Sequence, residues 1–178
     1  MTDKRIEQLA FQFRQAIDAA YRAHEFRNDF RFRKFPTGCC GDTSYLLAEY
    51  FLKKGIETIW VSTQRDDWTH AWLVLKDARV GIPTTISLPD DYLDLISAYR
   101  TQESEEETED IHYMEQDIID GLIIDITSDQ FDDCEKPVYV DYLDDFHRTF
   151  DFRLAVDFDG LNDERLEHLY EIIESYIC

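Results

Sequence analysis

The hydrophobic positions of the first segment recur at the three-and-four spacing of an amphipathic helix. Between residues 6 and 26, the apolar positions that follow this spacing are Ile6, Leu9, Ala10, Phe13, Ala16, Ile17, Ala20 and Tyr21. This spacing predicts a helix that packs one face against the core. A second and more strongly apolar helix is predicted over residues 45–52, with Gly55 where a C-terminal cap belongs.

Several later segments have the composition of strands. Residues 58–63 and 71–76 flank a polar turn at 64–67, which predicts a hairpin. Residues 121–127, 138–143 and 152–158 predict three more strands, and residues 162–177 predict a closing helix capped by Asn162. Helices at both ends with antiparallel strands between them indicate an α+β fold, with the N-terminal helices packed on an antiparallel sheet.

Residues 78–120 do not follow either periodicity. Pro83 and Pro89 interrupt them, residues 90–99 have helical spacing, and residues 101–110 are almost entirely acidic. We interpret this segment as an acidic insertion within one domain spanning residues 1–178. It can serve as a lid or recognition surface, or it can be a solvated loop, and the sequence leaves both interpretations open.

The composition is that of a globular protein with an acidic surface. With 178 residues, of which 44% are hydrophobic, the chain can bury a sizeable core. We find no apolar run of about 20 residues and no signal-peptide pattern, so we expect a soluble, cytoplasmic protein that does not contact membranes. The net charge of -21 argues against binding nucleic acid through its phosphates and favours a basic partner. The oligomeric state is left open.

Cys40 is the first residue whose setting suggests chemistry. The four cysteines form no CxxC pair, so reduced thiols are expected. Cys40 follows a glycine-containing loop and stands where the buried helix is expected to start. A helix N-terminus favours a thiolate, and its free N–H groups can hold an oxyanion. The alternative is a small residue that fills space beneath the loop.

His70 and Asp125 are the candidate partners of this thiol. His70 lies at the start of a predicted strand and titrates near neutral pH, so it can act as a base toward Cys40. Asp125 interrupts an otherwise apolar strand, where a buried carboxylate needs a partner. If these strands pair, Asp125 can accept the imidazole N–H and fix its tautomer. A core histidine and a solvent-facing aspartate are the alternatives.

The order and surroundings of these residues resemble the transglutaminase-like superfamily of papain-fold cysteine enzymes. The similarity rests on Gly38-x-Cys40-x-Asp42-x-Ser44, then His70-Ala71-Trp72, then Ile124-Asp125-x-Thr127. It implies a papain-like core with Cys40 as nucleophile, His70 as general base and Asp125 as orienting acid. Members of this superfamily usually join the last two strands by a short connection, so residues 78–120 depart from the pattern.

We therefore expect a cysteine-dependent enzyme that acts on an amide or acyl bond of a protein or peptide through a thioester. Proteolysis, deamidation and acyl transfer share this chemistry, and the sequence does not choose among them. No cofactor or metal is expected. The residues expected to contact the substrate are Gly38, Cys39, Gly41, Trp68, Trp72 and Gln130.

Two other classes remain open. One is a catalytically inactive acidic module that binds a basic partner protein, motivated by the net charge. The other is a metal site formed by Cys39, Cys40, His70 and Cys134, although zinc sites usually draw their cysteines from CxxC-type pairs rather than from adjacent positions.

Overall fold

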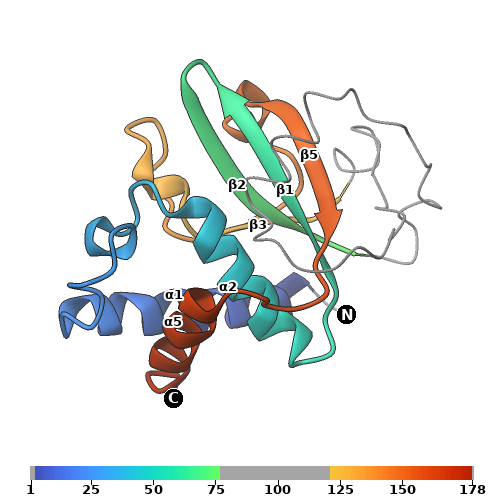
Figure 1. Ribbon diagram of the computed structural model, residues 1–178. Helices are drawn as coiled ribbons and strands as arrows, with labels where there is room; N and C mark the ends of the chain where they lie inside the picture. Colours follow the sequence, from blue (N-terminus) through green and yellow to red (C-terminus); the bar gives the residue numbers. More distant parts are fainter. Residues whose placement is uncertain (1–2, 77–120, 178) are drawn as a thin grey trace, which may run out of the picture.

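The chain forms an antiparallel sheet with helices packed against one of its faces (Figure 1). A computed structural model describes residues 3–76 and 121–177. The expected insertion at 78–120, with its predicted helix and acidic run, lies outside the described residues. Within the described residues the helices are α1 (Asp3–Arg22), α2 (Cys40–Leu52) and α5 (Glu164–Glu174).

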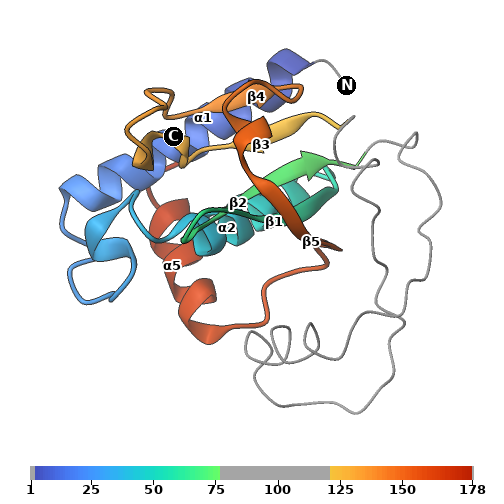
Figure 2. The same ribbon diagram turned by 90° about the horizontal axis from the view of Figure 1, so that it is seen from above.

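The sheet has five strands in the order β4-β3-β2-β1-β5, and every neighbouring pair is antiparallel. The strands are β1 (Thr58–Arg65), β2 (Trp68–Leu75), β3 (Ile123–Asp125), β4 (Tyr139–Asp141) and β5 (Asp151–Asp157). Each strand predicted from the sequence is present in the described residues, so the α+β fold with an antiparallel sheet is confirmed. Figure 2 shows that α1 runs alongside β4 at one side of the sheet.

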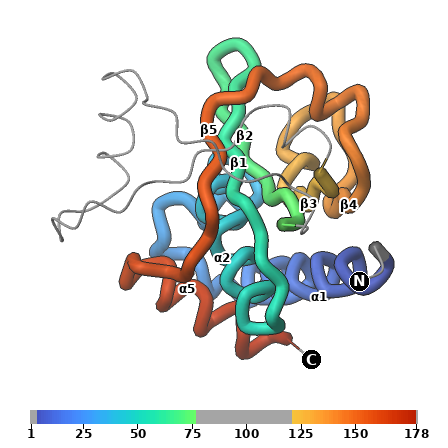
Figure 3. Tube along the Cα trace, turned by 90° about the vertical axis from the view of Figure 1, so that its right-hand side faces the viewer, coloured from blue at the N-terminus to red at the C-terminus, as the bar shows by residue number. Residues whose placement is uncertain are grey.

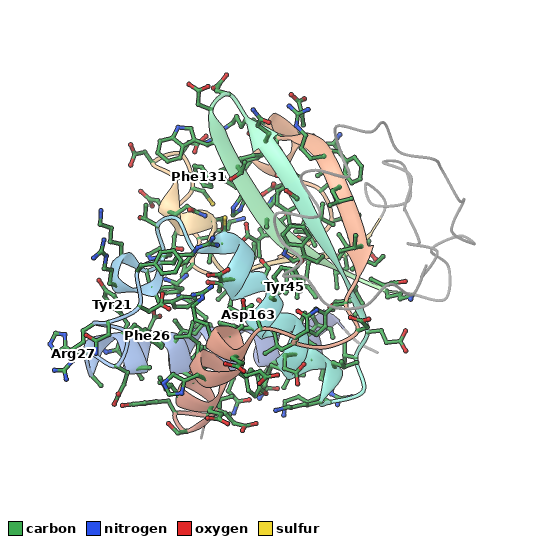
Figure 4. The ribbon with its side chains drawn as sticks, in the orientation of Figure 1. Tyr21, Phe26, Arg27, Tyr45, Phe131 and Asp163 are labelled. Carbon is green, nitrogen blue, oxygen red and sulfur yellow. The ribbon has the colours of Figure 1, made fainter. Side chains whose placement is uncertain are left out.

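The central helix is α2, which lies between the sheet and the other two helices (Figure 3). Its apolar residues point in several directions, and Leu46, Leu47 and Phe51 are all buried. A helix that is apolar around most of its circumference must be covered on all sides. Tyr45 of α2 stacks on Trp60 of β1, with ring centroids 5.0 Å apart (Figure 4).

The helix α1 buries the predicted face, and its Ile6, Phe13 and Ile17 side chains are fully buried. The opposite face of the sheet is covered by the chain around β4 and by the segment that leads into β5. There, buried Trp72 and Phe150 pack with the partly buried Phe131 and Phe146. The sheet therefore separates two apolar layers.

The helix α2 begins at Cys40, where the sequence predicts the start of the buried helix, although the apolar spacing itself begins only at residue 45 because the first turn is polar. One helix boundary differs from the sequence-based prediction. The predicted cap of the last helix, Asn162, is wrong. Asp163 is the N-cap, and its carboxylate accepts hydrogen bonds from the N–H groups of Arg165 and Leu166 (Figure 4).

The register between β2 and β3 positions the candidate site. Leu73 pairs with Ile124 and Val74 with Ile123. Continued along the strands, this register sets Asp125 opposite Trp72, two residues along from His70 and on the same face of the sheet. The strand pairing on which the sequence-based hypothesis depended is therefore present. No helix within residues 3–76 and 121–177 has both the length and the apolar content needed to cross a bilayer.

Candidate active site

Cys40 is the first residue of α2, and its side chain lies at the end of the helix that meets the start of β2. The first intrahelical bond runs from the Thr43 N–H to the Cys39 carbonyl, 2.8 Å long. The N–H groups of the first turn have no partner within the helix, so they present a positive potential at the sulfur. Cys40 is 9% exposed, and its Sγ lies 3.9 Å from the carbonyl oxygen of Thr69 on β2.

His70 and Asp125 form a buried hydrogen-bonded pair. His70 Nε2 lies 2.7 Å from Asp125 Oδ2, and neither side chain has measurable exposure. The other carboxylate oxygen, Oδ1, accepts hydrogen bonds from the N–H of Thr127 at 2.8 Å and from its hydroxyl at 3.2 Å. With Nε2 engaged by Asp125, the Nδ1 side of the imidazole remains for Cys40.

The pKa directions of the three groups fit a thiolate beside an imidazolium. Burial alone would raise the pKa of the Cys40 thiol, but the hydrogen bond and charge of His70 outweigh it and lower that pKa. Burial would likewise lower the pKa of His70, yet Asp125 and Cys40 raise it to about 9. The Asp125 carboxyl is buried too, and His70 and His147 together hold its pKa well below its usual range. Each charge in the site is therefore stabilised by its neighbour.

The adjacent Cys39 has the opposite character. Burial raises the pKa of its thiol to about 12. Its Sγ donates to the Pro36 carbonyl at 3.2 Å and accepts from the Thr43 hydroxyl at 3.6 Å. Cys39 is thus a buried thiol beneath the loop that precedes α2. It was expected to contact the substrate, but its side chain is only 1% exposed and has no open surface.

Gln130 reaches the site from the short helix of residues Ser128–Gln130, which follows β3. Its Oε1 accepts the N–H of Gly38 at 3.2 Å, and its Nε2 lies 3.2 Å from Nδ1 of His70. The contact with Gly38 fixes the orientation of the amide, because only the oxygen can accept. The amide NH₂ therefore faces Nδ1 of His70, and its hydrogen bond to the Cys40 sulfur helps to lower the pKa of that thiol.

Gly38 itself has a backbone φ of +74°, which side-chain-bearing residues rarely adopt. This conformation directs its N–H toward Gln130. Gly41, the next glycine expected at the substrate, lies in the first turn of α2, where an added Cβ would reach Trp60 at an ordinary 3.8 Å.

The two expected tryptophans lie in different environments. Trp68, at the start of β2, is 64% exposed and gives the site an open aromatic surface. Trp72 is 3% exposed and packs against the His70 ring at a centroid distance of 5.5 Å. Trp72 thus lies beneath His70 as part of the core and does not reach the surface where a substrate would bind.

Aromatic rings surround the outer side of His70. Phe131, labelled in Figure 4, and Phe150 lie 5.0 and 5.3 Å from the imidazole, measured between ring centroids. Together with Phe146 they form what we call the aromatic cluster. Because these rings keep water from His70, they strengthen its electrostatic interaction with Asp125.

Arg14 of α1 anchors the segment that carries Gln130. Its guanidinium makes two hydrogen bonds to Asp129, of 2.9 and 2.7 Å, and others to the carbonyls of Ile126 and Pro137 at 2.7 and 3.0 Å. Asp129 is thereby turned away from Cys40, while its neighbour Gln130 is turned toward it. No sequence signal pointed to this role, since Arg14 is a single cation of α1 that belongs to no motif, and only the structure shows that it is buried.

His147 is the second functional residue that sequence reasoning missed. Its Nε2 lies 3.3 Å from Oδ2 of Asp125, the oxygen that also contacts His70, and its Nδ1 lies 2.6 Å from Oδ1 of Asp144. The i,i+3 spacing of Asp144 and His147 was the available signal. It could not be assigned to the site, because residues 141–150 approach Asp125 only after the chain turns back from β4.

The described residues contain no group of three or more Cys, His, Asp or Glu side chains placed to hold a metal ion. Cys39, Cys40 and His70 do not converge on one point, because Cys39 bonds back to the preceding loop.

The site thus brings together a polarised thiol, an imidazole and a carboxylate, with an oriented amide beside them. This arrangement can form a nucleophilic sulfur, transfer a proton and stabilise a negative oxygen. We compared the chain with protein-family models, with curated proteins and with solved structures, and none of them matches it. What the fold and site define is an α+β protein with a buried Cys-His-Asp arrangement at the N-terminus of its central helix.

Proposed function

We propose that this protein is a cysteine-dependent enzyme that cleaves or transfers an amide or acyl group of a protein or peptide through a thioester on Cys40. The observation that carries the proposal is the buried 2.7 Å contact between His70 and Asp125 beside a thiol whose pKa is lowered. A buried ionisable pair is costly unless it is fully partnered, and one aimed at a thiol indicates catalysis more often than packing.

The first half of the reaction begins with the thiolate of Cys40. Its sulfur attacks the carbonyl carbon, and the carbonyl oxygen becomes negatively charged. The free N–H groups of the first turn of α2 and the amide NH₂ of Gln130 are the donors available to that oxygen. The His70 imidazolium then gives its proton to the departing amine, the C–N bond breaks, and a thioester remains on Cys40.

The second half uses the same groups in reverse. His70, now neutral, takes a proton from water or from an acceptor amine, which attacks the thioester carbon. The C–S bond breaks, the acid or new amide is released, and the thiolate forms again beside the protonated His70. Asp125 stays ionised throughout and holds the imidazole in the required tautomer.

The same residues support membership of the transglutaminase-like superfamily, with its papain-like core, as a proposal. Supporting features are a nucleophile helix that begins at Cys40, His70 near the start of an adjacent strand, and Asp125 on the next strand. The exposed Trp68 beside the site suits an extended peptide substrate, because aromatic rings pack against peptide backbone and apolar side chains alike.

The test is the pH dependence of alkylation of each cysteine by iodoacetamide, followed by mass spectrometry of the intact wild-type chain. Near pH 6.5 an ordinary thiol is only about 1% ionised, so we expect Cys40 to react about tenfold faster than the partly exposed Cys134. Cys39 should remain unmodified up to high pH, because the pKa of its thiol is about 12.

Two variants complete the experiment. His70→Ala should remove the advantage of Cys40 at neutral pH, whereas Phe11→Ala, at an exposed position of α1, should leave the profile unchanged. A wild-type Cys40 that follows an ordinary thiol profile, the same as in His70→Ala, would remove the basis of the proposal. If Cys40 is activated, the acceptor can be identified by incubating peptide mixtures and scoring cleavage, deamidation and amine transfer by mass.

A second candidate is an acidic module that binds a basic protein, which the net charge of -21 favours. Its signature would be retention of a basic partner by the Cys40→Ala variant, with binding that weakens steeply as salt rises.

A further inference from the structure

Asp125 has two histidine partners, and the function proposed above uses only one of them. Oδ2 of Asp125 lies 2.7 Å from Nε2 of His70 and 3.3 Å from Nε2 of His147. His147 is fully buried, with its ring 4.5 Å from that of Tyr139 and 5.0 Å from that of Trp72, measured between centroids. A buried histidine in contact with the orienting carboxylate affects the same proton that His70 must hold and release.

Both ring nitrogens of His147 face carboxylate oxygens. Nδ1 faces Oδ1 of Asp144 at 2.6 Å, while Nε2 faces Asp125. An ionised carboxylate only accepts hydrogen bonds, so each ring nitrogen is placed as a donor toward a negatively charged partner.

Asp144 is held in turn by the backbone. Its Oδ1 also accepts the N–H of His147 at 2.9 Å, which closes a local turn around the ring. Asp144 is only half-buried, with a side chain that is 32% exposed, so it connects the buried cluster to solvent. Asp144, His147, Asp125 and His70 form one continuous hydrogen-bonded series that leads from the surface to the catalytic sulfur.

We propose that His147, held between Asp144 and Asp125, carries a positive charge, and that it is a positioning residue whose charge competes with His70 for the Asp125 carboxylate and so limits how tightly His70 holds its proton. This inference rests on the proposed function, because it concerns the proton that the reaction moves. A second cation at the same oxygen repels the His70 imidazolium and weakens the hold of Asp125 on it.

The competition matters for the second half of the reaction. His70 must be neutral to accept a proton from water, yet its bond to Asp125 and its place among aromatic rings favour the imidazolium. The charge of His147 opposes that preference without removing the hydrogen bond that orients the ring. Asp125 also stays ionised more firmly with two partners than with one.

The other charged or titratable groups around the two rings come from every neighbouring element. They are Cys40 of α2, Arg65 of β1 over the aromatic cluster, Tyr139 of β4, and Lys136 over the Tyr139 ring. Arg65 pairs with Asp133, at 2.6 Å, and is separated from His70 by the aromatic rings. Among the described residues, only His147 places a second cation on the oxygen that His70 uses.

The test is an NMR titration of the His70 ring in the full chain, assigned by single substitution among the 5 histidines. In His147→Gln, whose amide can still donate to Asp125 but carries no charge, the His70 midpoint should rise by about one pH unit. An unchanged or lowered midpoint overturns the proposal.

Asp144→Asn provides a second measurement, in which the direction of the change in the His70 midpoint decides the outcome. This variant is less disruptive to folding because Asp144 lies near the surface. Loss of a negative charge would, through space alone, lower the His70 midpoint. If Asp144 instead acts by keeping His147 charged, its loss discharges His147 and the midpoint rises. Asp141→Asn, an exposed neighbour with no contact to His147 in the described residues, is the matched control and should not raise it.

Should His147→Gln fail to fold, Asp144→Asn decides alone, since a rise supports the proposal and a fall or no change rejects it. The titration observes His70 whether or not Cys40 reacts. If Cys40 has ordinary reactivity but the variants raise the His70 midpoint, the proposed enzyme function is rejected and the coupling of His147 to His70 is supported. If Cys40 is activated but the His70 midpoint does not rise, the coupling is rejected and the proposed function stands.

Discussion

The backbone N–H of Gly38 donates to the side-chain oxygen of Gln130 at 3.2 Å, across 92 positions of sequence. This contact joins the loop before α2 to the segment after β3, the two segments that flank Cys40. It also determines which end of the Gln130 amide faces the sulfur. In the proposed reaction, this contact would orient the Gln130 donor before a substrate binds, which is the condition for effective electrostatic stabilisation of an oxyanion.

Gly38→Ala should therefore change the reactivity of Cys40, and Gly55→Ala should not. Both glycines have positive φ, +74° and +71°, and neither would bring an added Cβ within 4 Å of another atom. Each substitution should cost about 1 kcal/mol of unfolding free energy through backbone strain. Only Gly38→Ala should slow Cys40 alkylation, because only Gly38 holds Gln130. Equal alkylation rates in the two variants would show that Gln130 does not influence the reactivity of Cys40.

Asp125→Asn should abolish the activation of Cys40 and destabilise the protein. The amide has no charge to hold the His70 imidazolium, so the pKa of His70 should fall from about 9 and the low-pH reactivity of Cys40 should be lost. Breaking a buried ion pair costs about 3–5 kcal/mol, measurable by urea denaturation.

Thr127→Val is the graded comparison for this variant. It removes one hydrogen bond to Asp125 but leaves the carboxylate charge in place, and it should cost only about 1 kcal/mol. If Thr127→Val were as damaging as Asp125→Asn, the role of the carboxylate charge would be rejected.

The dependence of stability on pH should be flat between about pH 6.5 and 9 in the wild type. The pKa of His70 is raised from 6.5 to about 9, so its contribution is full below pH 6.5 and is lost as the pH rises through 9. The pKa of Cys40 is lowered from its ordinary 9.0, so its contribution is present above that value and is lost as the pH falls. In this window the contributions of His70 and Cys40 to the pH dependence have opposite signs and cancel. The reason is that the two side chains together bind one proton in the folded chain and one proton in the unfolded chain.

Cys40→Ala should reveal the pH dependence that His70 alone contributes to the unfolding free energy. Without the thiol, the unfolding free energy should decrease by about 2 kcal/mol as the pH rises from 6.5 to 9, measured by urea denaturation at several pH values. Cys39→Ala, which removes a thiol that stays protonated in this range, should keep the flat profile. A flat profile in Cys40→Ala as well would mean that His70 is not held as a cation.

Arg14→Ala should loosen the segment that carries Gln130. It leaves the Asp129 carboxylate without its main cation and the carbonyls of Ile126 and Pro137 without their donor. We expect a loss of about 3–5 kcal/mol in unfolding free energy and slower alkylation of Cys40, because Gln130 follows Asp129 directly.

Asp18→Ala is the control for Arg14. It removes the 3.1 Å contact within α1 but leaves every bond of Arg14 to residues 126–137 intact. It should cost less than about 1 kcal/mol and leave alkylation unchanged. An effect comparable to that of Arg14→Ala would place the role of Arg14 in the helix rather than in the loop.

The fold followed from the sequence wherever one periodicity dominated. The face of α1 is regular, and the hairpin of β1 and β2 has a clear polar turn, so both were predicted to within a few residues. The cap of α5 was misassigned by one residue, because Asn162 and Asp163 have almost equal capping preference. Only the backbone conformation, with the Asp163 carboxylate aimed at the Arg165 N–H, separates them.

The site was predictable where residue type and local element coincide, as at Cys40, and not where it depends on the path of loops. From the sequence alone, Trp72 and Trp68 are equally good candidates for substrate contact. Both point to the same face of β2, but Trp68 lies at the exposed start of the strand and Trp72 lies in its buried second half. Arg14 and His147 reach the site through long-range contacts, and no local spacing encodes them.

The way β2 leads to β3 has a consequence for the assembly of the core. The N–H of Leu75 donates to the carbonyl of Leu122 at 2.9 Å, so the chain leaves and re-enters the sheet at one point. The two strands therefore end close enough to be joined by a short turn in place of residues 77–120. A chain shortened in this way should retain the Cys40 profile, because the order of the strands around His70 and Asp125 would be preserved.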